Sequence, residues 1–139
     1  MKRLFVILAA ALLLVAMPSK SDAQTIRDKY GAAVGKIESN GVIRDKYNAQ
    51  VGKIESNGVI RDKNNSQIGK IDNDGTIRDK YNSTVGKVCS DGTVRDKYNS
   101  QIGKIDNDGT VRDKYNASIG SARGIPKTWA GVYFFFSLN

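Results

Sequence analysis

Residues 44–60 read RDKYNAQVGKIESNGVI, and close variants of this 17-residue stretch fill most of the chain. The triplet Arg-Asp-Lys that opens it returns at a constant spacing of 17 residues. Its six copies start at Arg27, Arg44, Arg61, Arg78, Arg95 and Arg112. A β-branched residue followed by glycine recurs with the same period. Such a period is typical of a repeat protein in which each unit is one supersecondary element.

Each unit contains two turn sequences separated by short β-branched runs. The first is Asp-Lys-Tyr followed by Asn or Gly, as in residues 45–48, and the second ends in Asn-Gly or Asp-Gly, as in residues 55–58. Both fit a type I turn, with an acidic residue that accepts N–H bonds first and Asn or Gly where φ must be positive. Because the runs between them lack a helical period, we predict two short strands per unit in an up-and-down meander.

The repeats offer a lean core, because residues 26–120 contain no Leu, Phe or Met. The recurring glycine, at position 69 in the third unit, indicates a bulge or a close approach of backbones. Ile68 and Ile71 are three residues apart, so they cannot both face one side of a regular strand. Either a bulge brings both to one face, or both faces are partly buried.

The two ends of the array are incomplete units. Five hairpins are complete across the Asn-Gly or Asp-Gly turns, which leaves one strand at Ile26-Arg27 and one at Ile119-Gly120. We therefore predict a closed ring in which the last strand lies beside the first, since closure removes exposed sheet edges. The alternative is an open stack of hairpins with capped ends.

The N-terminal segment, residues 1–23, has the pattern of a signal peptide. Lys2 and Arg3 precede an apolar run of 14 residues, and Ser21-Asp22-Ala23 offers a cleavage site after Ala23. No cysteine follows the run, so we expect an exported protein, periplasmic or extracellular, that is not a lipoprotein and has no membrane span in its mature chain. Cleavage would take three of the 22 Lys and Arg and one of the 14 acidic residues, which leaves a net charge of +6.

The C-terminal segment breaks the period and is rich in aromatic residues. Residues 24–120 form the predicted repeat domain, and residues 121–139 are a linker and a closing segment of the same domain. Trp129 and the four residues of Tyr133–Phe136 are too apolar to stay in water as a tail, and the segment is too short for a membrane helix. We expect it to pack against or into the ring; the alternative is an exposed docking or membrane-contacting tail.

These features resemble a known family. Tandem (Ile/Val)-Arg-Asp-Lys-Tyr-Asn-x-x-(Ile/Val)-Gly-Lys-Ile-x-x-(Asn/Asp)-Gly units with a Trp-Ala-x-Val-x-Phe-Phe-Phe ending are similar to the bacterial β-flower proteins, most of all to the five-fold form. The resemblance covers residues 26–136 and implies hairpins arranged as petals around a pseudo-symmetry axis. It implies no catalytic residues, and the units would close as five petals or as six. The predicted fold class is all-β: tandem 17-residue hairpins in a pseudo-symmetric ring.

The composition argues against an enzyme. The chain has no histidine, which removes the commonest general base and metal ligand. Cys89, its one cysteine, replaces the acidic residue of a turn and is interpreted as a tolerated substitution rather than a redox or catalytic thiol. Residues 72–75 and 106–109 read Asp-Asn-Asp-Gly and resemble half of a calcium loop, but Lys70 and Lys104 stand where the earlier acidic ligand would be, so we interpret them as turn residues. We expect no cofactor and no metal.

The Arg-Asp-Lys-Tyr segments form the candidate ligand surface. A ring would display their cations and aromatic faces in a circle, with Asn64 in place of the sixth tyrosine. The candidate residues are Arg27, Tyr30, Arg44, Tyr47, Arg78, Tyr81, Arg95, Tyr98, Arg112 and Tyr115. These are either solvated turns with weak local ion pairs or a multivalent platform for a sugar or an anion.

We therefore expect a non-catalytic structural or interaction module whose partner the sequence does not identify. The alternative is a binding module for a carbohydrate or another polyanionic cell-surface polymer. Export disfavours nucleic acid as a partner, and the sequence leaves the oligomeric state open.

Overall fold

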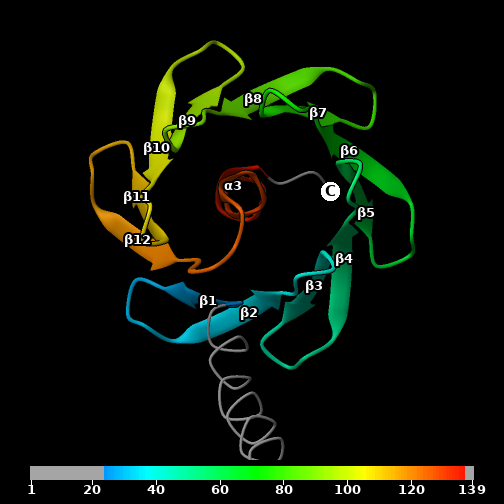
Figure 1. Cartoon of the computed structure of the whole chain (residues 1–139), viewed down its shortest axis with the longest axis horizontal. Coiled ribbons are helices and arrows are strands. Elements are labelled where there is room, and N and C mark those ends of the chain that lie inside the picture. The colour runs from blue at the N-terminus through cyan, green and yellow to red at the C-terminus, as the bar shows by residue number, and fades with distance from the viewer. Residues whose placement is uncertain (1–23, 137–139) are drawn as a thin grey trace, which may run out of the picture.

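The computed structural model describes residues 24–136, which form twelve short strands and one C-terminal helix (Figure 1). The predicted signal peptide, residues 1–23, lies outside the described residues. The strands are β1 (Thr25–Asp28), β2 (Ala33–Ile37), β3 (Val42–Asp45), β4 (Gln50–Ile54), β5 (Val59–Asp62), β6 (Gln67–Ile71), β7 (Thr76–Asp79), β8 (Thr84–Val88), β9 (Thr93–Asp96), β10 (Gln101–Ile105), β11 (Thr110–Asp113) and β12 (Ser118–Ser121). The helix is α3 (Lys127–Phe135).

The strands form a closed barrel in which each strand is antiparallel to both of its neighbours. The ring closes where β1 pairs with β12, with Arg27 opposite Ser121 and Asp28 opposite Gly120. This pairing confirms the prediction that the incomplete units at the two ends lie side by side. Within the described residues the sheet therefore has no open edge that could pair with another chain.

Twelve strands, two per repeat, make six hairpins around the ring, which settles the choice between five petals and six. We number the petals in chain order, so that petal 1 is β1–β2 and petal 6 is β11–β12. The Asp-Lys-Tyr turn is the tip of each petal and points away from the ring axis (Figure 1). The Asn-Gly and Asp-Gly turns connect each petal to the next.

Both turns have the predicted backbone geometry. At the petal tips, Asn48 has a φ of 70° and its N–H donates to the carbonyl oxygen of Asp45. At the connecting turns, Gly41 has a φ of 91°, and its N–H donates to the Glu38 carbonyl. A β-carbon on Gly41 would also collide with the carbonyl oxygen of Ile54 in the next petal. Glycine is therefore required at this turn both for its φ and for the close approach of two petals.

A β-bulge in every petal resolves the spacing of the apolar residues. In petal 3, Ile60 pairs with Gly69 while Arg61 pairs with Gln67, so Ile68 is an extra residue on β6. The equivalent shift occurs in the other five petals. The bulge lets the partly buried Ile68 pack against the core together with Ile71.

The core consists of two sets of aliphatic side chains that line the ring. The first set comes from the ends of the even-numbered strands: Ile37, Ile54, Ile71, Val88, Ile105 and the following Ala122. The second comes from the odd-numbered strands: Ile26, Ile43, Ile60, Ile77, Val94 and Val111. Each residue of the second set pairs with the glycine of the neighbouring even-numbered strand.

Helix α3 lies inside the ring (Figure 1), as the sequence predicted for the aromatic segment. Ala130, Gly131 and Val132 are buried, and the helix lies against β8 and β10. The helical conformation itself was not predicted. Within residues 24–136, no helix combines the length and the apolar character that a membrane crossing demands.

Candidate functional site

The petal tips hold the predicted tyrosines, and the aspartate of each tip determines their position. In petal 2 the Oδ1 atom of Asp45 accepts the backbone N–H groups of Tyr47, at 2.9 Å, and of Ala49, at 3.0 Å. The other five tips repeat this pair of bonds within 0.1 Å. Because the carboxylate is bonded to its own turn, the acid fixes the backbone and the next two side chains point outward.

Each tip exposes a tyrosine together with a lysine. Tyr30, Tyr47, Tyr81, Tyr98 and Tyr115 are 76–83% exposed. The ammonium group of the preceding lysine lies 5.2–5.3 Å from the centre of each ring. This is cation–π geometry at an exposed site, so the contact holds the two side chains together only weakly. In petal 3 the tip carries Lys63 and Asn64, both exposed.

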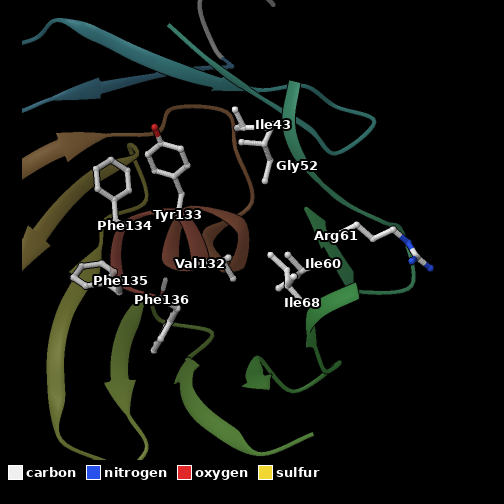
Figure 2. Close-up of a pocket in the computed structure, with 11 residues that line it drawn as sticks. Ile43, Gly52, Ile60, Arg61, Ile68, Val132, Tyr133, Phe134, Phe135 and Phe136 are labelled. Carbon is white, nitrogen blue, oxygen red and sulfur yellow. The ribbon is translucent and has the colours of Figure 1, made fainter. Parts of the chain in front are cut away.

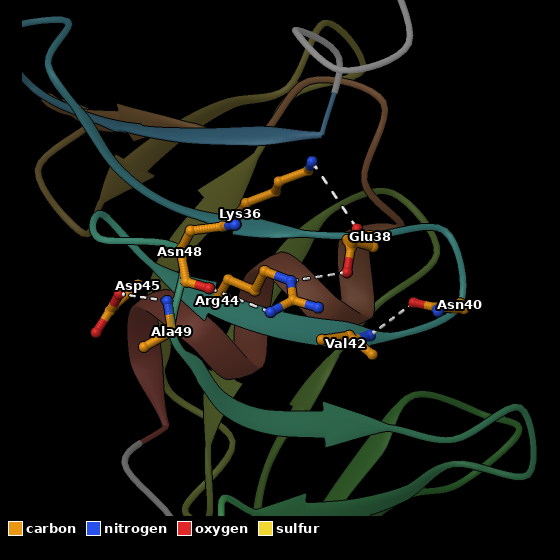
Figure 3. A network of polar contacts seen from close by, with 8 residues as sticks. All are labelled: Lys36, Glu38, Asn40, Val42, Arg44, Asp45, Asn48 and Ala49. Atoms are coloured by element: carbon orange, nitrogen blue, oxygen red, sulfur yellow. Dashed lines mark hydrogen bonds and ion pairs between the residues drawn. The ribbon is translucent and has the colours of Figure 1, made fainter.

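The arginines of the candidate ligand surface make hydrogen bonds within the ring. Arg44 donates from Nε to the Glu38 carboxylate at 3.0 Å and from Nη1 to the Asn48 carbonyl at 3.1 Å (Figure 3). Its side chain is only 29% exposed. The bond to the tip carbonyl recurs for every arginine of the series, at 3.0–3.2 Å. The structure thus places the arginines on the petal flank, and in petals 2, 3, 4 and 6 they link the connecting turn to the tip.

The lysines of the tips were missed as candidate residues, although the sequence contains the signal. Every Arg-Asp-Lys triplet has lysine third, including petal 3, where tyrosine is lacking. All six of these lysines are exposed: Lys29, Lys46, Lys63, Lys80, Lys97 and Lys114. We call the six lysines and five tyrosines the tip ring.

The Asp-Asn-Asp-Gly turns use their carboxylates for backbone bonds. Asp74 accepts the N–H of Thr76 at 3.0 Å, and this hydrogen bond holds the pKa of Asp74 below its usual value. Bonds to Thr93 and Thr110 lower the pKa of Asp91 and Asp108 in the same way. Among residues 24–136, no group of three or more Cys, Asp or Glu side chains is arranged to hold a metal ion.

Cys89 lies at the start of the connecting turn after petal 4, half-buried and with a free thiol. In petals 2, 3, 4 and 6 the arginine Nε bonds a carboxylate at this turn position, at 2.7–3.0 Å. Cys89 stands where Arg95 of petal 5 would find that carboxylate. Among the described residues, the structure gives Arg95 no ion pair.

Inside the ring, aromatic rings of the C-terminal segment lie over the glycines of the repeat. A β-carbon on Gly86, Gly103 or Gly120 would meet the ring of Phe136, Phe135 or Phe134, respectively. A β-carbon on Gly35 would lie 2.9 Å from the hydroxyl of Tyr133. The bare backbone of each glycine therefore makes room for one aromatic ring.

A hollow of about 370 Å³ lies beside these rings, at petals 2 and 3 (Figure 2). Its aliphatic wall consists of Ile43, Val51, Ile60 and Ile68, and Gly52 lies in the same wall. The opposite wall consists of Val132 and the four aromatic residues that follow it.

Comparison with known proteins gave one family match. A family model described as "5-fold beta-flower protein" matches residues 23–138. No curated protein and no solved structure matches the chain.

Proposed function

Because the chain belongs to the 5-fold β-flower protein family, whose description names a shape and no reaction, we propose that it is an exported, non-catalytic interaction module. Its tip ring binds an acidic polysaccharide or another repeating anionic polymer. The observation that supports this proposal is the repetition of one exposed lysine–tyrosine pair on five petals of a closed ring.

The chemistry of the tips favours an anionic, sugar-bearing ligand. Each tip aspartate is bonded to its own backbone, and each arginine is bonded on the petal flank, so the lysine is the outward charge. Tyrosine offers a flat apolar face for a sugar ring and a hydroxyl for its polar groups. Lysine next to it supplies a cation for a carboxylate or sulfate group.

Because the tips repeat, contacts that are weak one by one can together bind a polymer. One exposed cation–anion contact contributes little free energy, on the order of 1 kcal/mol or less. A polymer with repeating anionic groups can bind several tips at once, and each further contact is then intramolecular. The closed barrel supports this, because it fixes the spacing between the tips before the ligand arrives.

The sequence supports the exported location and the absence of catalysis. The pattern of residues 1–23 is that of a signal peptide, and an exported protein meets acidic polysaccharides at the cell surface. The chain lacks histidine, and its near-identical petals offer no asymmetric acid–base pair.

A binding screen against acidic and neutral polysaccharides tests the proposal. We expect binding to acidic polymers that weakens as salt is added. Replacing Lys46, Lys80, Lys97 and Lys114 together by Gln should reduce the affinity by about tenfold or more. The matched control replaces four lysines of the strands, Lys53, Lys70, Lys87 and Lys104, by Gln and removes the same charge.

Petal 3 allows a test by gain of affinity. Asn64→Tyr supplies the sixth tyrosine at a tip whose backbone already has the same geometry, with its N–H bonded to Asp62. We expect this variant to bind the polymer more tightly than the natural chain. Equal losses for the tip and strand lysine variants, or no binding to any polymer, would contradict the proposal.

A further inference from the structure

Between petals 1 and 2, one carboxylate lies between two cations of the ring (Figure 3). Glu38 accepts the Nε–H of Arg44 at 3.0 Å, and its other oxygen lies 3.9 Å from the Nζ atom of Lys36. Lys36 and Arg44 are directly opposite each other in the ladder of β2 and β3, so their side chains share one face of the sheet. Their neighbours Ile37 and Ile43 line the core, so this is the outer face, away from helix α3.

The junction between petals 4 and 5 has the same two cations and the same turn backbone. Lys87 lies opposite Arg95 in the ladder of β8 and β9. The N–H of Cys89 donates to a carbonyl oxygen of β9 at 2.8 Å, and the Cys89 carbonyl accepts the turn N–H at 2.9 Å. Both of the equivalent distances at Glu38 are 2.9 Å. The two junctions therefore differ in the side chain at the start of the turn, which is a thiol in place of a carboxylate.

The side chain of Arg95 is held in position but keeps one donor. Its Nη1 atom donates to the Asn99 carbonyl at 3.1 Å, as in the other petals. Among residues 24–136, its Nε–H has no acceptor, whereas four other arginines donate from Nε to a carboxylate at 2.7–3.0 Å. Because the bond to Asn99 orients the guanidinium group, this donor is placed before any ligand arrives.

Two aspartates lie near these cations, and both are bonded to their own turns. Asp91 and Asp74 each accept the backbone N–H two residues further on, at 2.9 and 3.0 Å. These bonds lower the pKa of both carboxyl groups, and nearby cations, Arg95 and Lys87 among them, lower it further.

Petal 6 shows that such an aspartate does not prevent the arginine from binding a second carboxylate. Asp108 has the place that Asp91 has in petal 5, and the charge of Arg112 contributes to its lowered pKa after the bonds to Thr110. The Nε–H of Arg112 nevertheless donates to Asp106 at 2.9 Å. The presence of Asp91 is therefore compatible with a carboxylate at Arg95.

We propose that Arg95 and Lys87 form a binding site for one carboxylate group of a ligand. The ligand carboxylate takes the position that the carboxylate of Glu38 takes between Arg44 and Lys36. The ligand class follows from the four junctions in which the same arginine atom binds a carboxylate. Since cysteine has fewer side-chain atoms than aspartate or glutamate, an external carboxylate can replace theirs beside Cys89.

The site deepens the proposed function and rests on it in one respect, which is the source of the carboxylate. The bond from Arg95 to Asn99 places the site next to the tip of petal 5, which carries Lys97 and Tyr98. A polymer of uronic acids that binds this tip can therefore place a further carboxylate at Arg95. Both contacts then belong to one ligand, and the second is intramolecular.

NMR of the arginine Nε–H groups tests the site directly. The protein is titrated with galacturonate at constant ionic strength, and with galactose as the neutral control. We expect a saturable shift of the Arg95 Nε–H with galacturonate alone. The Nε–H groups of Arg44, Arg61 and Arg78 serve as internal controls, because each is already bonded to a carboxylate. No shift at Arg95, or equal shifts at all of these arginines, would overturn the proposal.

Two variants move the site within the ring. Cys89→Asp supplies a carboxylate from the chain itself and should abolish the response of Arg95 to galacturonate. Asp106→Ala removes the carboxylate from Arg112 and should make the Nε–H of Arg112 respond as that of Arg95 does. If Arg95 responds equally with and without Cys89→Asp, the proposal is wrong, whether or not the second variant folds.

A polymer separates the site from the proposed function. Polygalacturonate should bind about tenfold or more tightly than galacturonate, and Cys89→Asp should weaken the polymer about twofold or more. If Arg95 responds to galacturonate but no polymer binds, the proposed function fails and the carboxylate site stands. If polymers bind through the tip lysines while Arg95 responds to neither compound, the carboxylate site is overturned and the proposed function stands.

Discussion

In petals 2, 3, 4 and 6 the arginine of the repeat bonds two turns at once. Arg112, for example, donates from Nε to the Asp106 carboxylate at 2.9 Å and from Nη1 to the carbonyl oxygen of Asn116 at 3.2 Å. The spacing of these residues is the same in every repeat, so the interaction recurs wherever the acidic residue is present. The sequence marked the arginines as candidate ligand residues. It could not show where their side chains point, because the register between paired strands decides which acidic residue lies beside each arginine.

Cys89 provides a test of this interaction. Cys89→Asp should give Arg95 the partner that Asp72 and Asp106 give to Arg78 and Arg112. We expect the free energy of unfolding to rise by up to about 1 kcal/mol, because such pairs are partly exposed and screened. Chemical denaturation measures the change. Cys89→Ser is the uncharged control, and an equal gain in both variants would show that the ion pair contributes nothing.

Three aspartates of the connecting turns should make the stability of the protein depend on pH. Bonds to the backbone lower the pKa of Asp74, Asp91 and Asp108 from their ordinary value of 3.8. A carboxyl whose pKa is lower in the folded state contributes stability above pH 3.8, and the contribution is lost as the pH falls through the lowered pKa. Replacing all three by Asn should therefore reduce the loss of Tm between neutral and strongly acidic pH.

Two other petals supply the reciprocal control for the acid response. Asn40 and Asn57 occupy the same turn position and accept the same backbone bond at 3.1 Å without a titrating group. Changing both to Asp should make the Tm more sensitive to acid. Identical pH profiles of natural chain and variants would contradict this account of the turns.

At the scale of elements, the strands and turns were predictable, whereas the helix was not. Asn-Gly and Asp-Gly turns between β-branched residues specify antiparallel strands locally. Residues 127–135 contain aromatic and β-branched residues that favour strands as much as helices. They form a helix because the interior of the ring offers no open strand edge, so the segment has to satisfy its backbone within itself.

The aromatic rings of the C-terminal segment pack against glycines of the strands. Alanine substitutions at two strand glycines measure how much this packing limits the space for a β-carbon. Gly103→Ala would push a β-carbon into the Phe135 ring and to 2.7 Å from the Arg112 carbonyl. Among the described residues, a β-carbon at Gly52 would lie 2.9 Å from the equivalent carbonyl of Arg61 and 3.7 Å from Cδ1 of Ile43. We expect Gly103→Ala to cost about 1–3 kcal/mol more than Gly52→Ala, as judged by denaturant midpoints. Equal costs would mean that the rings do not press on the glycines.

For the whole molecule, closure followed from the sequence because the two ends carry complementary halves of one unit. Within the chain order β1 pairs with β2 and β12 with β11, which leaves one edge of each terminal strand unpaired, and the pairing of β1 with β12 satisfies both edges. The tyrosines of the candidate site could be located at turns because the turn sequence Asp-Lys-Tyr recurs with the period of the repeat. The hollow at Gly52 could not be predicted, since it depends on which petals the aromatic side chains reach.

The helix is the part of the core that the repeats do not supply. Deleting residues 125–139 should unfold or aggregate the protein, because the aliphatic side chains that line the ring would face water. Size-exclusion chromatography and circular dichroism of the shortened chain measure the outcome. A shortened chain that stays folded, soluble and monomeric would contradict a structural role for the segment.

The constant length of the repeat has a consequence for how such proteins can evolve. In-frame duplication or loss of one unit in the gene would add or remove a whole petal and preserve every pairing register on either side. The barrel would still close, because the terminal halves would still match. The single C-terminal helix sets the limit, since a wider or narrower ring would no longer fit the aromatic side chains that reach its glycines. Petal number and the length of the aromatic ending are therefore expected to change together among related genes.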